Sequence, residues 1–176
     1  MSERIIRRAR EEDLPHIARI NAEVFLGDRD HPESAKNWVD CYFRAFPLYQ
    51  YFVAEVDGRV VGYAGWQAHG GFHRAEPVFE LDQVGVTKSE QHKGISLELQ
   101  RTCMRMLTDW ARETNDRIES HVTFVVWVYG FNDNAKNSYA QVFGEGMQGF
   151  RTQFGYRAEV MLRCRFPVIR PVRNDS

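Results

Sequence analysis

The sequence predicts a single α/β domain with a mixed, twisted sheet of six or seven strands and about four flanking helices. β-like runs alternate along the chain with segments whose apolar residues recur every three or four positions, as in amphipathic helices. Asp57-Gly58 separates two β-rich runs, Tyr51–Val56 and Val60–Gln67, and this dipeptide is the strongest short-range signal for a hairpin. A length of 176 residues suits one domain with a substantial core.

Composition narrows the function classes. The net charge of −1 makes no global electrostatic case for binding to nucleic acid or to a membrane surface. The three isolated cysteines, Cys41, Cys103 and Cys164, favour a reducing compartment over a disulfide or zinc framework. Because no long apolar run or signal-peptide core is seen, we expect a cytoplasmic protein. We expect the domain to span 1–166, with a loose tail over 167–176.

The N-terminal third predicts a strand and two helices. Ile5 and Ile6 open a short strand, and Asp13 is in position to cap the helix that follows. A second helix is expected over Ser34–Phe46, ended by Pro47. Its apolar residues are expected on one side, which favours a core helix: they are Trp38, Val39, Tyr42, Phe43 and Phe46.

A loop with two histidines follows the hairpin. His69 and His73 lie near Glu76 and Glu80 in the sequence, and these residue types are possible metal ligands. No helical His-x-x-x-His spacing or cysteine ligand supports a metal site. A surface loop is the favoured interpretation, and no metal is predicted.

The central stretch combines a strand, a basic loop and a helix. Val78–Thr87 alternates apolar and polar residues, and a long helical pattern runs from Leu97 to near Asn115. Between them lies a glycine-containing loop. Backbone N–H groups at a helix N-terminus have no intrahelical partner and carry partial positive charge, so this junction predicts a phosphate-binding site.

This loop resembles a known motif. Gln91-x-x-Gly94-x-Ser96 is similar to the Gln/Arg-x-x-Gly-x-Gly/Ala motif of the GNAT N-acetyltransferases, in which the loop binds the pyrophosphate of acetyl-coenzyme A (acetyl-CoA). The resemblance implies the GNAT fold and acetyl-CoA as co-substrate. It also assigns the cofactor contacts to Gln91, His92, Lys93, Gly94, Ile95 and Ser96. Ser96 departs from the motif, but serine is small enough for close backbone approach.

A second motif follows the expected strand His121–Tyr129. Asn132-x-x-Ala135-x-x-x-Tyr139 resembles the GNAT Asn-x-x-Ala-x-x-x-Tyr pattern. We expect Asn134 or a neighbour to cap a helix on which Ala135 and Tyr139 share a face. The resemblance implies that Asn132 belongs to the cofactor site and that the Tyr139 hydroxyl projects toward the cofactor sulfur.

Gly144–Gly149 reads as a literal G-x-G-x-x-G, but we reject a dinucleotide fingerprint. The preceding residues look helical, and too little chain remains for the βαβ unit that the fingerprint needs. The GNAT family usually has Gly-Phe shortly after the tyrosine; here Phe143-Gly144 stands there and Gly155-Tyr156 comes later. We interpret the difference as an insertion that lengthens or breaks the fourth helix. With the last strand, Arg157–Phe166, it is a candidate homodimer contact.

Acyl transfer from a thioester to an amine needs hydrogen-bond donors and a base, and a proton donor aids the leaving thiolate. The resemblance places the donors in the backbone of Val84, Gly85 and Val86, where the strand would pair with the pantetheine arm. Gly85 suits close approach, although it could equally mark a bulge.

The resemblance also makes Glu80 the first candidate for the general base, because it lies six residues before Val86, where several GNAT members have a catalytic glutamate; Asp82 is the second candidate. Alternation would put both on the face of Val84 and Val86 unless a bulge disturbs the register. Tyr139 is the candidate general acid. Cys103 and Cys164 are expected to pack rather than react.

The main hypothesis is an N-acetyltransferase that passes acetyl from acetyl-CoA directly to a primary amine. The alternatives are a non-catalytic acyl-CoA-binding module and an acyltransferase that uses a longer acyl-CoA. The acceptor stays open among small amines or polyamines, aminoglycosides, amino acids and proteins. Acidic residues in Asp28–Glu33 and Glu76–Asp82 hint at a cationic acceptor.

Overall fold

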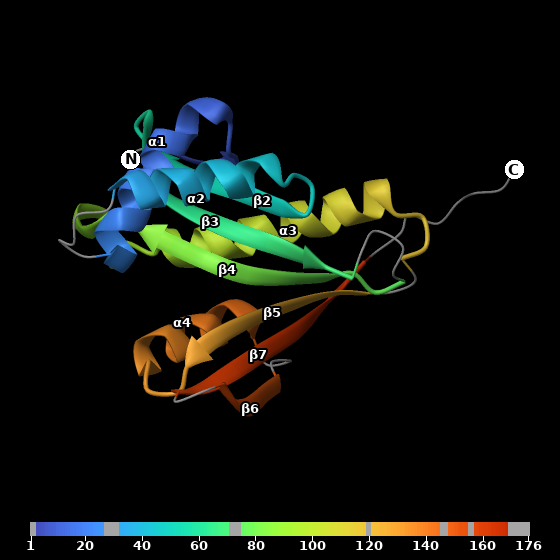
Figure 1. Cartoon of the computed structure of the whole chain (residues 1–176). Coiled ribbons are helices and arrows are strands. Elements are labelled where there is room, and N and C mark those ends of the chain that lie inside the picture. The colour runs from blue at the N-terminus through green and yellow to red at the C-terminus, as the bar shows by residue number, and fades with distance from the viewer. Residues whose placement is uncertain are drawn as a thin grey trace, which may run out of the picture.

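A computed structural model describes residues 3–26, 32–70, 75–118, 121–144, 148–154 and 157–168. Within these residues, seven strands form one sheet in the order β1-β2-β3-β4-β5-β7-β6 (Figure 1). Neighbouring strands are antiparallel except for β4 and β5, which are parallel. The strands are β1 Arg4–Arg8, β2 Tyr49–Val56, β3 Arg59–His69, β4 Val78–Val86, β5 His121–Tyr129, β6 Gln148–Phe154 and β7 Arg157–Pro167.

Helices cover both faces of this sheet (Figure 1). The main helices are α1 Leu14–Asn21, α2 Pro32–Arg44, α3 Ile95–Thr114 and α4 Asp133–Phe143. A π-helical turn, Ala22–Leu26, continues α1. Across the described residues, no helix is both long and apolar enough to span a bilayer.

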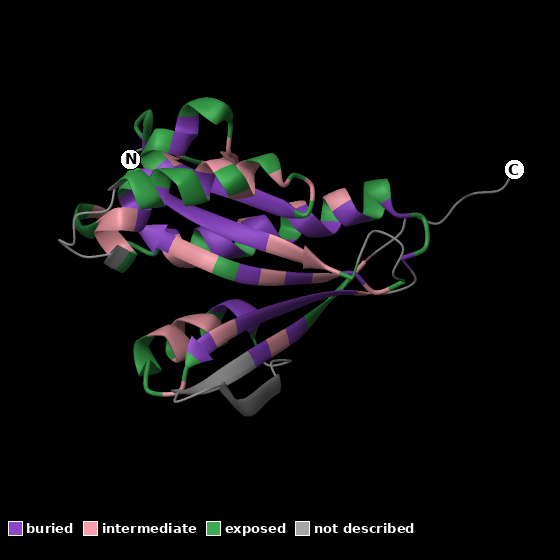
Figure 2. Ribbon diagram, in the orientation of Figure 1, coloured by how far each residue is buried: buried purple, intermediate pink, exposed green. Residues whose placement is uncertain are grey.

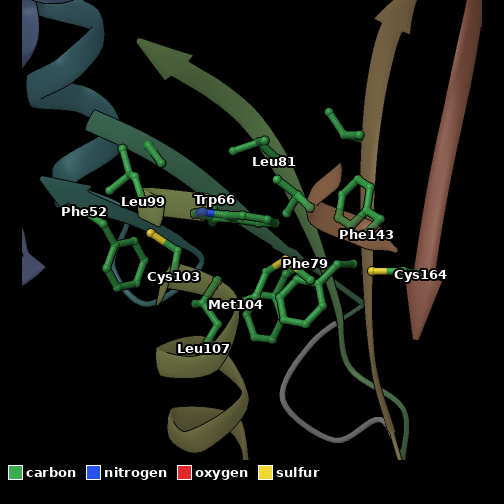
Figure 3. Packing of buried hydrophobic residues seen from close by; sticks show 14 of the residues in the cluster. Phe52, Trp66, Phe79, Leu81, Leu99, Cys103, Met104, Leu107, Phe143 and Cys164 are labelled. Carbon is green, nitrogen blue, oxygen red and sulfur yellow. The ribbon is translucent and has the colours of Figure 1, made fainter. Parts of the chain in front are cut away.

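Two apolar cores lie on opposite faces of the sheet. Phe52 and Ala54 of β2 belong to the larger core, which packs against α3 and α4. Tyr51 and Val53 alternate with them and belong to the smaller core under α1 and α2. Because strand residues alternate between faces, the central strands are buried on both sides (Figure 2). Figure 3 shows Trp66 of β3 within the larger core, between residues of α3 and β4.

The predicted hairpin is confirmed. Asp57 and Gly58 have φ angles of 48° and 75°, as both central residues of a type I′ turn require. The strands on either side are β2 and β3, which pair antiparallel. The turn chemistry and the β-rich flanks agree, which is why the local signal was sufficient here.

The expectation that one side of the second helix is a core face is wrong for two of its five residues. Val39 is buried at 1% exposure, but Trp38 is 60% and Phe46 56% exposed. Consecutive helix residues differ by about 100° in direction, so Trp38 cannot follow Val39 into the core. Phe46 lies beyond Arg44, where α2 ends.

Asp13 precedes α1 as expected, but its side chain does not cap the helix. Its carboxylate instead accepts hydrogen bonds from the Arg7 guanidinium, at 2.6 and 3.0 Å, and from the Arg10 backbone N–H, at 2.7 Å. A charged partner on β1 outcompetes the helix N–H groups for the same oxygens. The acid therefore ties α1 to the sheet.

The glycine-rich stretch after α4 is a connection between two elements. The helix is not lengthened: α4 ends at Phe143, and β6 begins at Gln148. Since the residues before Gly144 are helical, the rejection of the dinucleotide fingerprint is confirmed. Residues 145–147 and the later Gly155-Tyr156 lie outside the described residues. β7 extends to Pro167, and Val168 packs against the larger core, whereas residues 169–176 of the expected tail are outside the description.

Candidate functional site

The sheet opens where β4 and β5 separate. The two strands pair only from Val78–Leu81 on β4 and from Thr123–Val126 on β5. Beyond this point they diverge (Figure 1), and among the described residues the β5-facing edge of β4 has no strand partner over 82–86. An unpaired strand edge offers backbone groups to an extended ligand.

A β-bulge lies at the point of separation. Trp66 of β3 pairs with Leu81, and Gly65 pairs with Gln83, so Asp82 is the extra residue on β4. Because of this extra residue, odd-numbered residues before the bulge and even-numbered residues after it lie on the same face of the sheet. Phe79 and Leu81 contribute to the larger core, and so do the later residues Val84 and Val86.

The expectation that Glu80 and Asp82 share a face with Val84 and Val86 is therefore wrong. Residues 80 and 84 would share a face in a regular strand, but one inserted residue shifts the alternation by one place. The two carboxylates lie on the other side from the two valines, toward α1 and α2.

A cleft of about 570 Å³ occupies the opening between β4 and β5. Helices α1, α2 and α4, strands β4 and β5, and the π-helical turn after α1 line it. Its lining residues are Asn21, Phe25, Ser34, Ala35 and Trp38 from the α1–α2 side, Asp82, Gln83 and Val84 from β4, Trp127, Val128 and Tyr129 from β5, and Asn132, Ala135 and Tyr139 around α4. A volume of this size is typical of small-molecule sites.

Asp82 is held in the cleft by Tyr49. The Tyr49 hydroxyl donates a hydrogen bond to Asp82 Oδ2 at 2.8 Å. Burial raises the pKa of Tyr49, so the hydroxyl keeps its proton near neutral pH. A Cβ on Gly65 would stand 2.2 Å from the Tyr49 hydroxyl oxygen, so this glycine makes room for the ring. Sequence reasoning missed both residues; a glycine inside a strand was the available signal.

Gln83, next to Asp82 in the cleft wall, is fixed by hydrogen bonds from Asn21 and Tyr63. The Asn21 side-chain amide donates to the Tyr63 hydroxyl at 2.7 Å and to Gln83 Oε1 at 3.0 Å. The Tyr63 hydroxyl donates to the same Gln83 oxygen at 3.1 Å. These hydrogen bonds link Asn21 of α1, Tyr63 of β3 and Gln83 of β4, and they fix Asn21 and Gln83 in the cleft wall.

Glu80 lies just before the separation point, opposite Val125 in the β4–β5 pairing. Its Oε2 is 2.7 Å from Nε2 of His69, at the end of β3. Glu80 is not among the residues lining the cleft. Among the described residues, no three His, Cys, Asp or Glu side chains are placed to hold a metal ion together, and His73 lies outside the description.

Gly85 is required by packing. A Cβ at this position would stand 2.8 Å from Cε1 of Tyr63 and 3.3 Å from Cγ2 of Ile20. Both contacts lie toward the smaller core. The close approach at Gly85 is therefore to β3 and α1, and the bulge is at Asp82.

Tyr139 reaches the cleft from α4. The helix is capped by Asn132, whose Oδ1 accepts a hydrogen bond from the Ala135 N–H at 3.1 Å; the cap is thus the neighbour of Asn134 rather than Asn134 itself. Ala135 and Tyr139 both line the cleft, as their four-residue spacing predicts. Burial raises the pKa of Tyr139, so its hydroxyl is protonated near neutral pH.

The loop before α3 borders a second cavity, of about 450 Å³. Its lining includes Gln91, His92, Gly94, Ile95 and Ser96, together with Ser138 of α4. His92 and Gly94 have left-handed φ angles of 61° and 77°. A Cβ on Gly94 would meet nothing within 4 Å, so the backbone here faces open space.

Side chains of this loop hold its shape. Gln91 Nε2 donates to the Val86 carbonyl at 2.9 Å, and Lys93 Nζ is 3.0 Å from Glu90 Oε2. Ser96 Oγ accepts from Gln100 Nε2 at 3.0 Å. The first backbone N–H groups of α3 have no intrahelical partner. An open face with these donors fits the pyrophosphate of a coenzyme A.

Cys103 and Cys164 pack in the core, as expected, and do not form a nucleophilic site. Cys103 and Cys164 are buried free thiols. Burial raises the pKa of both, to about 12 for Cys164. Such thiols stay protonated at neutral pH and are unreactive.

Solved structures share this fold at low sequence identity. The ribosomal-protein-S18-alanine N-acetyltransferase from Escherichia coli has a TM-score of 0.62 and 17% identity, covering 98% of each chain. The aminoglycoside N-acetyltransferase AAC(6')-Iy in complex with CoA has a TM-score of 0.68 and 16% identity, covering 88% of this chain and 95% of its own. The protein yncA from Salmonella typhimurium, solved with its cofactor acetyl-CoA, has a TM-score of 0.59 and 18% identity, covering 98% of each chain.

The comparison with curated proteins finds no match to this chain. The family model "Acetyltransferase (GNAT) family" matches residues 6–144. This range contains the separation of β4 and β5, the loop before α3 and the motif on α4. It ends at Gly144, where the connection to β6 begins. The match over most of the chain, with the fold and the two motifs in their places, shows that the chain belongs to the GNAT acetyltransferase family.

Proposed function

We propose that the protein is an N-acetyltransferase that passes acetyl from acetyl-CoA directly to a primary amine. The observation that carries the proposal is the cleft at the separation of β4 and β5. It brings together an unpaired strand edge, a protonated Tyr139 and the carboxylate of Asp82, with Glu80 two residues away. The CoA and acetyl-CoA bound by two of the similar structures support the choice of donor.

The chain's own groups suit the binding of acetyl-CoA, which supplies the activated acetyl group when bound. The N–H groups of the loop Gln91–Ser96 would bind its pyrophosphate. The backbone of Val84–Val86 would pair with the pantetheine arm as an added strand. The backbone N–H groups of Val84–Val86 would also stabilise negative charge on the thioester oxygen. Asn132 would act by holding the start of α4 beside this edge.

Glu80, Asp82 and Tyr139 are the candidate groups for binding the amine and for proton transfer. Glu80 would remove the proton of the amine through a water molecule and share it with His69 at 2.7 Å. Asp82, inside the cleft, would hold the amine and is the second candidate for the base. Tyr139, whose raised pKa keeps its hydroxyl protonated before the reaction, would donate that proton to the departing sulfur and would be reprotonated from water.

Steady-state kinetics on three conservative variants test these roles. Glu80→Gln should lower kcat by about 10²- to 10⁴-fold, the usual contribution of a general base. Tyr139→Phe should also lower kcat, whereas Asp82→Asn should mainly raise KM for the amine. Acetyl-CoA binding, measured by calorimetry, should survive in all three.

The outcomes separate the alternatives. If Asp82→Asn lowers kcat by about 10²- to 10⁴-fold and Glu80→Gln leaves kcat unchanged, Asp82 is the base. If the unmutated protein binds acetyl-CoA but acetylates no amine, the non-catalytic binding module is supported instead. Turnover with a longer acyl-CoA but not with acetyl-CoA would change the donor.

A further inference from the structure

We infer, on the basis of the proposed function, that the acceptor is an amine with one positive charge and a flat aromatic body. Polyamines, aminoglycosides and amino acids with a free carboxylate are then poor acceptors. Two independent features of the cleft lead to this inference: its charge and the exposure of its aromatic side chains.

The charge of the cleft suits a single cation. Among the described residues that line it, Asp82 is the one carboxylate, and none is Lys, Arg or His. The hydrogen bond that Asp82 makes is with the neutral hydroxyl of Tyr49, at 2.8 Å. Its negative charge is therefore not compensated by a cation of the cleft wall and is available to an ammonium group.

The same charge argues against the other acceptor classes. A polyamine or an aminoglycoside carries several ammonium groups, and each one brought out of water needs its own anionic partner. An amino acid brings a carboxylate, which would find no cation among the described lining residues and would be repelled by Asp82. The wall thus suits an acceptor with one charged nitrogen.

The apolar body of the acceptor is indicated by two exposed aromatic residues. Trp38 of α2 is 60% exposed and Phe25 of the π-helical turn is 53% exposed, and both line the cleft. Trp38 leans on Tyr42, with ring centroids 5.2 Å apart, and this contact supports the ring from one side. Large aromatic side chains are usually more buried than this.

Tyr129 extends the aromatic lining on the β5 side. It lines the cleft, and its ring is stacked on Phe131 with an interplanar angle of 4°. Rings on two sides of one cleft can pack against a flat group between them and can also attract a cation to their faces. The chemistry that fits is an arylalkylamine: a ring for Trp38 and Phe25, and an ammonium group for Asp82.

A matched set of acceptors tests the inference. Phenethylamine and phenylalanine differ by one carboxylate, and phenethylamine and n-butylamine differ by the ring. Spermidine and kanamycin represent the polycations. We expect kcat/KM for phenethylamine to exceed that of each of the other four by about tenfold or more, since one good aromatic or charged contact gives about this factor.

Variants locate the effect. Trp38→Ala should raise KM for phenethylamine about tenfold, leave kcat within about twofold, and change KM for n-butylamine much less. Trp38→Phe should restore most of the affinity because it keeps a ring. Leu48→Ala is the control, since Leu48 is an apolar residue of similar exposure, 50%, outside the cleft lining.

Three results would overturn the inference. A preference for spermidine, kanamycin or phenylalanine overturns it while the proposed function stands, because acetyl transfer is still observed. An unchanged KM for phenethylamine in Trp38→Ala also overturns the inference and leaves the proposed function standing. The third result is binding of acetyl-CoA without acetylation of any of these amines. Failure of acetyl-CoA to bind at all would instead remove the proposed function and the inference with it.

Discussion

At the scale of single residues, the contact between Gly65, Tyr49 and Asp82 decides the geometry of the cleft. Tyr49 is 2% exposed, and its hydroxyl reaches the Asp82 carboxylate. The ring occupies the space that a side chain at position 65 would need. An acidic group in the site is thus positioned by a tyrosine from β2 and a glycine from β3.

The substitution Gly65→Ala tests this contact. The new methyl would stand 2.2 Å from the hydroxyl oxygen and 2.8 Å from Cζ of Tyr49. We expect a loss of unfolding free energy of about 1–3 kcal/mol, as for other overpacked cores. Urea denaturation measures the change. Tyr49→Phe is the comparison, because it keeps the ring, removes one hydrogen bond and should cost about 1 kcal/mol. If Gly65→Ala unfolds at the same urea concentration as the unmutated protein, the ring does not hold Asp82 in this way.

At the scale of elements, one ion-pair network fastens α1 to the sheet. Arg7 of β1 lies between Asp13, at 2.6 Å, and Glu55 of β2, at 3.0 Å. Desolvation acts to raise the pKa of Asp13, which is only 3% exposed. The hydrogen bonds from Arg7 and from the Arg10 N–H outweigh it, so the pKa is lowered in the folded protein. The network thus connects α1, which carries Asn21 of the cleft wall, to strands β1 and β2.

We therefore expect acid to weaken this connection. A carboxyl whose pKa is lower in the folded than in the unfolded state stabilises the fold above its unfolded pKa of about 3.9. The stabilisation is lost as pH falls through the folded pKa. Asp13→Asn should cost about 3 kcal/mol near pH 7, because it breaks a largely buried pair, and the difference from the unmutated protein should shrink below about pH 4.

Chemical denaturation at several pH values measures this. Glu12→Gln is the matched control, because Glu12 pairs with Arg10 in an exposed position, with side chains 69% and 67% exposed. It should leave the pH profile unchanged. A constant difference between Asp13→Asn and the unmutated protein from pH 7 to pH 3 would contradict the role given to Asp13.

At the scale of the whole molecule, the site lies between two parts of one sheet. Strands β1–β4 and β5–β7 are joined by a short parallel pairing of four residues on each strand, and by the larger core. The loop before α3 belongs to the first part and α4 to the second. Both contribute to the cavity beside Gly94, which Ser138 completes. A ligand in this cavity would contact both parts and stabilise the folded state.

We expect acetyl-CoA to raise the melting temperature. At about a hundredfold excess over the Kd, binding adds about 2.7 kcal/mol, which corresponds to roughly 5–10 °C for a chain of this size. Differential scanning fluorimetry measures the shift. NADH is the control ligand, and Gly94→Val is the control variant because valine is strained at a φ of 77°. A shift that Gly94→Val retains would place the binding elsewhere, and no shift would oppose the cofactor assignment.

The sequence by itself determined most of the elements and their order, but it did not predict β6, Gln148–Phe154. The hairpin at Asp57-Gly58, the long helix α3 and the strand β5 depend on local periodicity and turn chemistry, which need no distant partner. The loop Gln91–Ser96 and the spacing of Asn132, Ala135 and Tyr139 were readable for the same reason. Each lies within one short segment whose backbone conformation is set by its own residues.

Only the tertiary structure decided which side chains meet. The bulge at Asp82 arises from the pairing of β4 with β3, and it turned the two carboxylates away from Val84 and Val86. Tyr49 meets Asp82 across three strands, and Trp38 remains exposed although its helical spacing suggested a core face. Such contacts depend on register and on the packing of distant segments, which a linear pattern does not specify.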